Sequence, residues 1–377
     1  MKFYSVNEIE NMYVYGRTVV NDDCIPLFWN HSGVEVRVTG SELWIEVETD
    51  CGHLEPWIAT ELNGAMMSRQ MLMPGNHSIC LFRSFSPDTV KTVKFYRELQ
   101  AVSEDFKCKV LVKGFRTDGE FLPVLKKKAK LEFVGDSISS GEGTYGASDD
   151  TEWTACYMSS SRHYAHILEK AFNADVRIIS QGGWGVYSGW DNDVRHNIPS
   201  IYEKVCGLQE GDMNVALGAQ KENDFESWQP DAVIINLGTN DNSCFNTPPL
   251  NVPGYGVCKL YRNSDGSLRE EDADKIKTAV IKFLKMVRLH NPKAHILWAY
   301  GMLGYELTLT ITDAVNVYVK ETGDKNVAFI NLPDTNKDTV GAHGHPGYKA
   351  HIEAAKVLGK YLGDRLGLGF SLPEGNL

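Results

Sequence analysis

No stretch of the 377-residue sequence approaches the roughly 18 consecutive apolar residues that a membrane-spanning helix needs. Basic residues are also few relative to acidic ones: Lys and Arg total 38, Asp and Glu total 49, and the formal net charge is −11. A chain with this excess of negative charge lacks the basic surface that nucleic-acid binding requires, and little attracts it to an anionic membrane. We therefore expect neither a nucleic-acid partner nor membrane association.

The sequence also lacks a CxxC pair, because its eight cysteines are scattered along the chain. Such spacing is not typical of a zinc site or of a disulfide framework. The N-terminal segment has no apolar core, and Glu8 and Glu10 follow closely after the start, unlike a signal peptide. We therefore expect mostly free, buried thiols and a cytoplasmic protein; secretion would be expected only if a leader preceded the printed sequence.

The length suits two domains, and 42% hydrophobic with 23% charged residues is ordinary for a globular protein. Short strands dominate the first third. Val34, Val36 and Val38 alternate with polar residues, which is typical of a half-buried strand. Similar short apolar runs lie at 43–47, 78–82, 92–96 and 108–112. With no long amphipathic helix among them, the runs predict a β-sandwich over residues 1–125.

Strands alternate with helices in the rest of the chain, residues 126–377. The expected strands are 131–134, 175–180, 230–237, 294–300 and 327–332, and the expected helices are 162–172, 270–290, 312–322 and 347–366. In the helix over 270–290, Ile276, Val280 and Val287 fall on one face. The alternation predicts a second domain, a three-layer α/β fold with a parallel sheet. In such sheets the active site lies at the carboxyl ends of the strands.

Four polar or glycine-rich segments directly follow predicted strands of the second domain. They are Gly135-Asp136-Ser137-Ile138, the segment 180–185, Gly238-Thr239-Asn240-Asp241, and the segment 341–347. Each one alone is also typical of an ordinary turn or helix cap. Together they bring to one edge of the sheet a serine nucleophile, Ser137, and a base, His345. They add two oxyanion donors, the backbone N–H of Gly183 and the side-chain amide of Asn240.

In this order the four segments resemble the sequence blocks of the SGNH hydrolases, also called GDSL hydrolases. With the β-rich segment before them, nearly the whole chain is similar to carbohydrate esterase family 2, which comprises acetylxylan esterases and related O-acetyl esterases. The resemblance implies that Ser137 is the nucleophile and His345 the base. It implies an oxyanion hole made by the N–H groups of Ser137 and Gly183 and the side chain of Asn240. It also implies that residues 1–125 form a jelly-roll, carbohydrate-binding-like domain.

One position departs from the pattern of the wider superfamily, in which an aspartate usually stands three residues before the histidine. Here that residue is Ala342. A backbone carbonyl must then orient His345, or an acid from elsewhere, such as Asp334 or Asp338. Ser–His dyads are known in carbohydrate esterase family 2, so the departure agrees with that family. His351, farther along the predicted helix, is expected to point elsewhere.

Two further motif matches do not change this interpretation. The run 141–146 fits GxGxxG, but it does not open a helix directly after a strand, so we expect no dinucleotide site. His343 and His345 are spaced like a metal-binding pair, but no third ligand has convincing spacing. We therefore expect no metal and no other cofactor.

The expected function is that of a serine esterase that removes O-acetyl groups from acetylated xylan or related plant polysaccharides and oligosaccharides. Trp184 and Asp241 are further candidates for substrate binding, although Trp184 is equally typical of a core aromatic. A short-chain carboxylesterase or lipolytic enzyme is the alternative, and after it a glycan-binding protein without catalysis. The sequence leaves open the polysaccharide, the acetylated position, whether the chain forms a homo-oligomer, and whether the first domain binds glycan.

Overall fold

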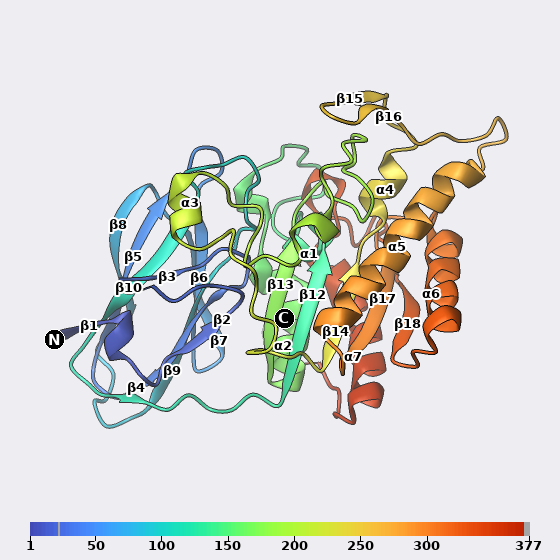
Figure 1. Cartoon of the computed structure of the whole chain (residues 1–377). Coiled ribbons are helices and arrows are strands. Elements are labelled where there is room, and N and C mark those ends of the chain that lie inside the picture. The colour runs from blue at the N-terminus through green and yellow to red at the C-terminus, as the bar shows by residue number, and fades with distance from the viewer. Residues whose placement is uncertain (22, 373–377) are drawn as a thin grey trace.

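The computed structural model describes residues 1–21 and 23–372, and in them the chain forms two structural units (Figure 1). The strands of the first unit are β1 Lys2–Ser5, β2 Tyr13–Tyr15, β3 Ile25–Pro26, β4 Gly33–Val38, β5 Leu43–Asp50, β6 Trp57–Leu62, β7 Ala65–Met71, β8 Gly75–Phe82, β9 Lys91–Arg97, β10 Lys109–Thr117 and β11 Phe121–Leu122. They form two antiparallel sheets. One has the order β1-β10-β5-β8 with β3 beside β10, and the other has the order β11-β4-β9-β6-β7 with β2 beside β4.

The two sheets share one hydrophobic core, to which each strand contributes alternate side chains. Along β5 the side chains of Leu43, Ile45 and Val47 are buried, while the residues between them are partly exposed. They pack into one apolar cluster with residues of the other sheet, such as Val36 of β4 and Phe95 of β9. The predicted β-sandwich is therefore confirmed.

Several strands extend beyond the apolar runs from which they were predicted. Strand β10 continues to Thr117, which pairs with Leu43 at the far end of β5. Strand β8 begins at Gly75, opposite Thr49 of β5. Backbone pairing with a long neighbour holds these residues in the sheet, although their own side chains do not alternate between apolar and polar.

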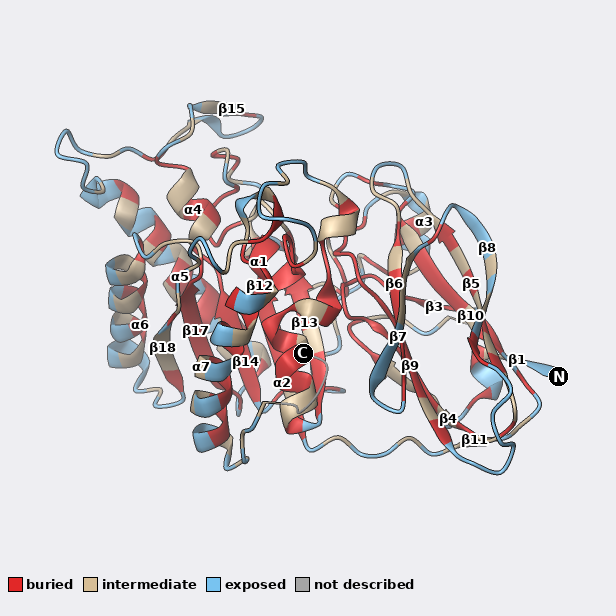
Figure 2. Ribbon diagram, turned by 180° about the vertical axis from the view of Figure 1, so that it is seen from behind, coloured by how far each residue is buried: buried red, intermediate tan, exposed pale blue. Residues whose placement is uncertain are grey.

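The second unit contains a parallel sheet. Its strands are β12 Ala129–Gly135, β13 Ala174–Ser180, β14 Ala232–Asn236, β17 His295–Gly301 and β18 Val327–Leu332, in the order β13-β12-β14-β17-β18. The register sets Leu131 of β12 beside Val176 on one side and Ala232 on the other. The central strands are buried on both faces (Figure 2), which explains their continuous apolar sequence.

Helices cover both faces of this sheet. The long ones are α2 Tyr164–Phe172, α5 Glu270–His290, α6 Thr308–Thr322 and α7 Tyr348–Leu366. Ile234 and Leu297 of the sheet pack with α2 and α7, whereas their neighbours Ile235 and Ile296 pack with α5 and α6. Because adjacent strand residues face opposite sides, the two helix pairs lie on opposite faces, and the predicted three-layer architecture is confirmed. None of the described helices combines the length and apolar character needed to span a membrane.

The remaining elements are short, and the sequence did not predict them. They are the helices α1 Ser137–Ser140, α3 Asp212–Ala216 and α4 Thr239–Ser243, the hairpin strands β15 Leu250–Val252 and β16 Gly256–Cys258, and 3₁₀ turns at Val6–Glu8, Ala155–Tyr157, Ser160–Arg162, Ile198–Ile201 and Ala342–Gly344. Helices α1 and α4 begin within three residues of the end of a central strand. Elements of this length bury too few residues to leave a periodic signal in the sequence.

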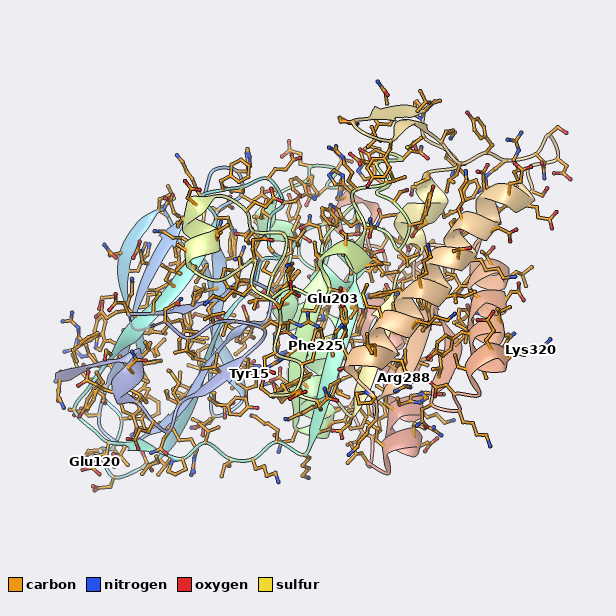
Figure 3. The ribbon with its side chains drawn as sticks, in the orientation of Figure 1. Tyr15, Glu120, Glu203, Phe225, Arg288 and Lys320 are labelled. Carbon is orange, nitrogen blue, oxygen red and sulfur yellow. The ribbon has the colours of Figure 1, made fainter. Side chains whose placement is uncertain are left out.

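The long helices begin and end for identifiable reasons. Helix α6 starts four residues earlier than the sequence predicted, in a threonine-rich segment of low helix propensity. Leu307 and Ile311 are fully buried there, and their packing stabilises the additional helical turn. Arg288 lies near the end of α5 (Figure 3). Its guanidinium donates to the carbonyls of Asn291 and Ala294 beyond the helix. Cationic side chains are favourable at this end because it carries the negative pole of the helix dipole.

The two units meet in a buried network of charged and polar side chains. Glu169 of α2 accepts a hydrogen bond from His31 of the first unit at 2.6 Å and is paired with Lys94 of β9. Tyr13 of β2 donates to Asp175 of β13 at 2.5 Å. The edge strand β13 therefore faces the sandwich, as Figure 1 shows. The division into separate domains at 125/126 stays a prediction.

All eight cysteines lie among the described residues as free thiols. Cys24, Cys108, Cys206 and Cys244 are buried, and the others are partly or fully exposed, so fewer are buried than the sequence led us to expect. Burial raises the pKa of Cys206 and of Cys244 to about 12. These two thiols are therefore protonated and unreactive at neutral pH.

Candidate active site

Ser137 is the first residue of α1, directly beyond the end of the central strand β12. Asp136 caps this short helix, because its Oδ1 accepts a hydrogen bond from the N–H of Ile138 at 3.0 Å. The chain turns sharply here, and a Cβ on Gly135 would lie 1.9 Å from Oγ of Ser139. Only glycine fits this turn, which presents the Ser137 side chain at the carboxyl end of the sheet.

His345 approaches Ser137 from the segment between β18 and α7. Its Nε2 lies 2.9 Å from Oγ of Ser137, and its Nδ1 lies 2.9 Å from the backbone carbonyl of His343. A carbonyl can only accept, so Nδ1 carries the proton and Nε2 presents its lone pair to the serine hydroxyl. This tautomer suits a general base.

The structure decides between the two ways of orienting His345 that the sequence left open. Asp334 accepts from the N–H groups of Gly304 and Thr335, and Asp338 is exposed, so neither contacts the imidazole. The carbonyl of His343 takes that role. The sequence missed one acid altogether: Oε1 of Glu142 lies 3.5 Å from Nδ1 of His345. Glu142 is about 200 positions away in the chain, and it lies in the glycine-rich run 141–146 that matches GxGxxG.

Gly183 lies in the turn after β13. Its φ of +81° is in the left-handed region, where glycine is favoured. Its carbonyl accepts a hydrogen bond from the N–H of Trp190 at 2.9 Å. The preceding N–H, of Gly182, donates to Oε1 of Gln100 at 2.8 Å. This turn is therefore held from two sides, by its own loop and by the β-sandwich.

Asn240 is the second residue of α4, after β14, and its side chain is fixed by two acceptors. Its Nδ2 lies 3.0 Å from the carbonyl of Trp184 and 3.2 Å from Oδ2 of Asp136. Burial raises the pKa of Asp136 to about 7, and the negative charges of Asp241 and Glu142 add to the rise. Asp136 thus links the serine turn to the asparagine.

A pocket of about 510 Å³ joins these parts, lined by Ser137, Glu142, Trp153, Gly182, Gly183, Trp190, Asn240, His343 and His345. All four residues that the sequence brought together therefore share one cavity. The two tryptophans are 48% and 54% exposed, which is unusual for such large apolar side chains. No pattern in the sequence distinguished them, because both lie in irregular loops.

Two weaker candidates from the sequence lie elsewhere. Trp184 packs against the core and stacks on His196 at 5.0 Å, so its side chain is an anchor for the loop and does not line the pocket. Asp241 is fully buried, and its carboxylate accepts from three backbone N–H groups, those of residues 186–188. In this position Asp241 holds the loop that follows Trp184, and substrate binding by Asp241 stays a prediction.

The first unit supports the loops that form the site. Besides Gln100, Asn30 donates to the carbonyl of Ser139 in α1 at 3.2 Å and accepts from the hydroxyl of Ser180 at the end of β13. Both side chains are fully buried. The first unit therefore supports the loops that carry the serine and Gly183, which the sequence alone left undecided.

Among the residues that the structure describes, two groups of side chains have the spacing of metal ligands. They are Glu142 with His343 and His345, and His31 with His166 and Glu169; in each group the ligand atoms lie within 4.8 Å of one another. The first group supplies the third ligand that the sequence did not reveal. However, both Nδ1 atoms in that group already have hydrogen-bond partners, the carboxylate of Glu142 and the carbonyl of His343. We therefore interpret it as a hydrogen-bonded group.

Comparisons with known proteins agree with this geometry. The model of the GDSL-like Lipase/Acylhydrolase family matches residues 133–351, a span that contains all four residues of the pocket that the sequence identified. The solved structure of an acetyl xylan esterase from the rumen bacterium Butyrivibrio proteoclasticus is 54% identical, with a TM-score of 0.95, over 97% of this chain and 98% of that one.

Two more distant relatives match most of this chain. The structure of a family two carbohydrate esterase from Clostridium thermocellum, in complex with cellohexaose, has a TM-score of 0.76 at 23% identity and covers 94% of this chain and 99% of that chain. At this identity the likeness shows the fold alone. The cellulase/esterase CelE of Acetivibrio thermocellus is 26% identical over 348 residues, which are 90% of this chain. The alignment spans only 36% of that relative's own length.

Proposed function

Because the chain belongs to the GDSL-like lipase/acylhydrolase family, we propose that it is a serine esterase that removes O-acetyl groups from acetylated xylan. The observation that carries the proposal is the 2.9 Å distance between Nε2 of His345 and Oγ of Ser137 in an accessible pocket. The acetylated xylan substrate is supported by the 54% identical relative, which is an acetyl xylan esterase. The resemblance to carbohydrate esterase family 2, inferred from the sequence, agrees with these matches.

In the first half of the reaction, Nε2 of His345 accepts the hydroxyl proton as Oγ of Ser137 attacks the acetyl carbonyl carbon. The carbonyl oxygen becomes an oxyanion. The N–H groups of Ser137 and Gly183 donate to it, together with the amide of Asn240 once one of its two N–H groups turns from Oδ2 of Asp136 to the oxyanion. The tetrahedral intermediate collapses when the protonated His345 gives its proton to the departing sugar oxygen, which leaves an acetyl group on Ser137.

In the second half, a water molecule takes the place of the sugar. His345 removes a proton from this water as its oxygen attacks the acetyl-serine carbonyl, and the same three donors hold the new oxyanion. His345 then returns the proton to Oγ of Ser137, and acetate leaves. Atoms and protons balance over the cycle with water as the only co-substrate.

The lining of the pocket suits a carbohydrate. Trp153 and Trp190 line it and are about half exposed, and exposed aromatic surface beside polar groups is typical of a ligand-binding site. Sugar rings present apolar C–H faces that stack on such side chains. We propose that the two tryptophans bind the sugar that carries the acetyl group.

Replacing Asn240 with alanine should lower kcat by roughly 10²-fold, the usual effect of losing one oxyanion donor. The reason is that the oxyanion exists only after Ser137 attacks, so the amide stabilises the transition state more than the bound substrate. Initial rates of acetate release over a range of substrate concentrations give kcat and KM separately. A change in KM alone would mean that Asn240 binds only the ground state.

The proposal is tested by acetate release from acetylated xylan at neutral pH in the presence of EDTA. We expect release from acetylated xylan and from p-nitrophenyl acetate, and none from the same xylan after alkaline deacetylation. Acetylated glucomannan in a parallel assay ranks the two polysaccharides. Loss of activity in EDTA, with recovery on addition of zinc, would contradict the serine mechanism.

The same assay separates the alternative functions. Cleavage of p-nitrophenyl acetate without release from either polysaccharide would indicate a short-chain carboxylesterase. Cleavage of long-chain p-nitrophenyl esters at comparable rates would indicate a lipolytic enzyme. Binding to xylan without any cleavage would indicate a glycan-binding protein.

A further inference from the structure

A buried carboxylate lies behind the proposed base. The side chain of Glu142 is 4% exposed, and its Oε1 lies 2.7 Å from Nδ1 of His343 and 3.5 Å from Nδ1 of His345. A carboxylate removed from water needs a hydrogen-bonded or charged partner. The ring N–H of His343 is that partner, because Nδ1 can only donate to an ionised carboxylate.

His343 connects this carboxylate to the base through its own backbone. Its φ of +54° and ψ of 30° are left-handed, a conformation that residues other than glycine rarely adopt. In this conformation its N–H donates to the carbonyl of Asp150 at 2.6 Å, and its carbonyl accepts from Nδ1 of His345. Such conformations persist only where their surroundings hold them, and they gather at functional sites.

The segment that carries Glu142 packs tightly against the segment that carries the histidines. A Cβ on Gly143 would lie 2.6 Å from the carbonyl of Ala342 and 2.7 Å from Cβ of His345. The N–H of Ala342 also donates to the carbonyl of Gly143 at 3.2 Å. This close backbone contact restricts the position of the segment, and the backbone of Glu142 is therefore fixed relative to the histidines.

The two imidazole rings lie parallel. Their planes differ by 6° and their centres are 5.3 Å apart. Rotation of either ring is therefore limited by the other, and the hydrogen bond from His343 to Glu142 limits both. These contacts form a continuous path from the carboxylate to the imidazole that contacts Ser137.

We propose that Glu142 is a positioning residue for the esterase reaction: through His343 it fixes the carbonyl that orients His345, and its charge stabilises the imidazolium that His345 becomes. This inference rests on the proposed function, in which His345 is the base. It gives the chain an acid beside its base although position 342 is alanine. The acid approaches from the loop after the nucleophile and not from the loop that carries the histidine.

Four charged or titratable groups surround His345, and among them Glu142 has the nearest negative charge. They are Glu142, His343, His351 of α7 and, behind Glu142, Asp136. Burial lowers the pKa of His351 to about 3, so this ring is neutral while the enzyme works. The carboxylate of Glu142, at 3.5 Å, is therefore the nearest negative charge to Nδ1 of His345.

The test is Glu142→Gln, which keeps the size and an acceptor for His343 but removes the charge. We expect kcat for p-nitrophenyl acetate to fall about tenfold while KM changes less than about twofold, because the charge matters most when His345 is protonated in the transition state. The acid limb of the kcat/KM profile should move to lower pH by about one unit, since His345 then releases its proton more easily. A purely structural role for Glu142 would not move this limb.

Two variants serve as controls. Glu142→Asp keeps the charge, so its acid limb should stay within about 0.3 pH units of the wild-type position even if kcat falls. Glu152→Gln removes an exposed carboxylate from the same loop, and its profile should match that of the wild type. Thermal unfolding of every variant, measured in EDTA, shows whether each protein is folded.

The outcomes separate this inference from the proposed function. An unchanged kcat and acid limb in Glu142→Gln would overturn the inference. An equal loss of activity in the Gln and Asp variants without movement of the limb would also overturn it, in favour of a structural role. The function itself stands or falls on Ser137→Ala: if that variant stays active, the serine mechanism is wrong whatever Glu142 does.

Discussion

Replacing Ser137 with alanine is expected to lower kcat for acetate release by roughly 10³-fold or more, as in other serine hydrolases. The hydroxyl of Ser137 is the atom that forms the acetyl-enzyme, and the described residues offer no other hydroxyl within hydrogen-bond distance of Nε2 of His345. Residual activity would come from direct attack of a water molecule on the ester, with the oxyanion donors still stabilising the intermediate. Pre-steady-state measurements with p-nitrophenyl acetate in excess over enzyme should also show no burst of p-nitrophenol.

Ser139→Ala is the matched control for this variant. Ser139 lies in the same short helix, and its buried hydroxyl is hydrogen-bonded to that of Tyr164 at 2.5 Å. Its loss should cost about 1 kcal/mol of unfolding free energy, the typical net value of one hydrogen bond, with kcat within a few-fold of the wild type. If both variants lost activity equally, the loss would reflect the helix and not the nucleophile.

His345→Ala should be as damaging as the serine variant, with kcat lower by roughly 10³-fold or more. Without the imidazole, no group accepts the Ser137 proton or protonates the leaving sugar. Addition of free imidazole to the variant should restore part of the activity, which a misfolded protein would not show. Rates with p-nitrophenyl acetate should suffer less than rates with xylan, because p-nitrophenolate leaves without a proton.

His351→Asn is the comparison that tests the choice of histidine. His351 is fully buried, and its Nδ1 accepts a hydrogen bond from the N–H of Tyr164 at 3.3 Å. The side-chain oxygen of asparagine can take over this acceptor role. We expect a less stable protein that retains most of its kcat, and the reverse pattern of activities in the two variants would show that the base has been assigned to the wrong histidine.

The sequence determined most of the fold because local patterns coincide with the packing. Leu43, Ile45 and Val47 alternate in the sequence and face the core of the sandwich. The helix Glu270–His290 and the strand Val327–Leu332 were predicted with their observed bounds. Periodic burial leaves a periodic trace, and the parallel topology follows from the alternation of strands and helices.

The sequence also placed Ser137, Gly183, Asn240 and His345 at one edge of the sheet, because each follows a strand and parallel strands end together. The pocket contains all four. The variants described above measure their chemical roles.

Tertiary structure alone decided what surrounds these residues. Glu142 reaches the histidines because the segment after α1 packs on the segment before α7, and nothing local in the sequence connects positions that far apart. The same holds for Gln100, which the sandwich brings to Gly182. Strand β18 lies at the far edge of the sheet from β13, yet the chain that follows it returns to Ser137 at β12. Such contacts form when long loops bring distant segments together. The side chains of these loops show no repeating pattern, so the sequence alone does not indicate which of them come into contact.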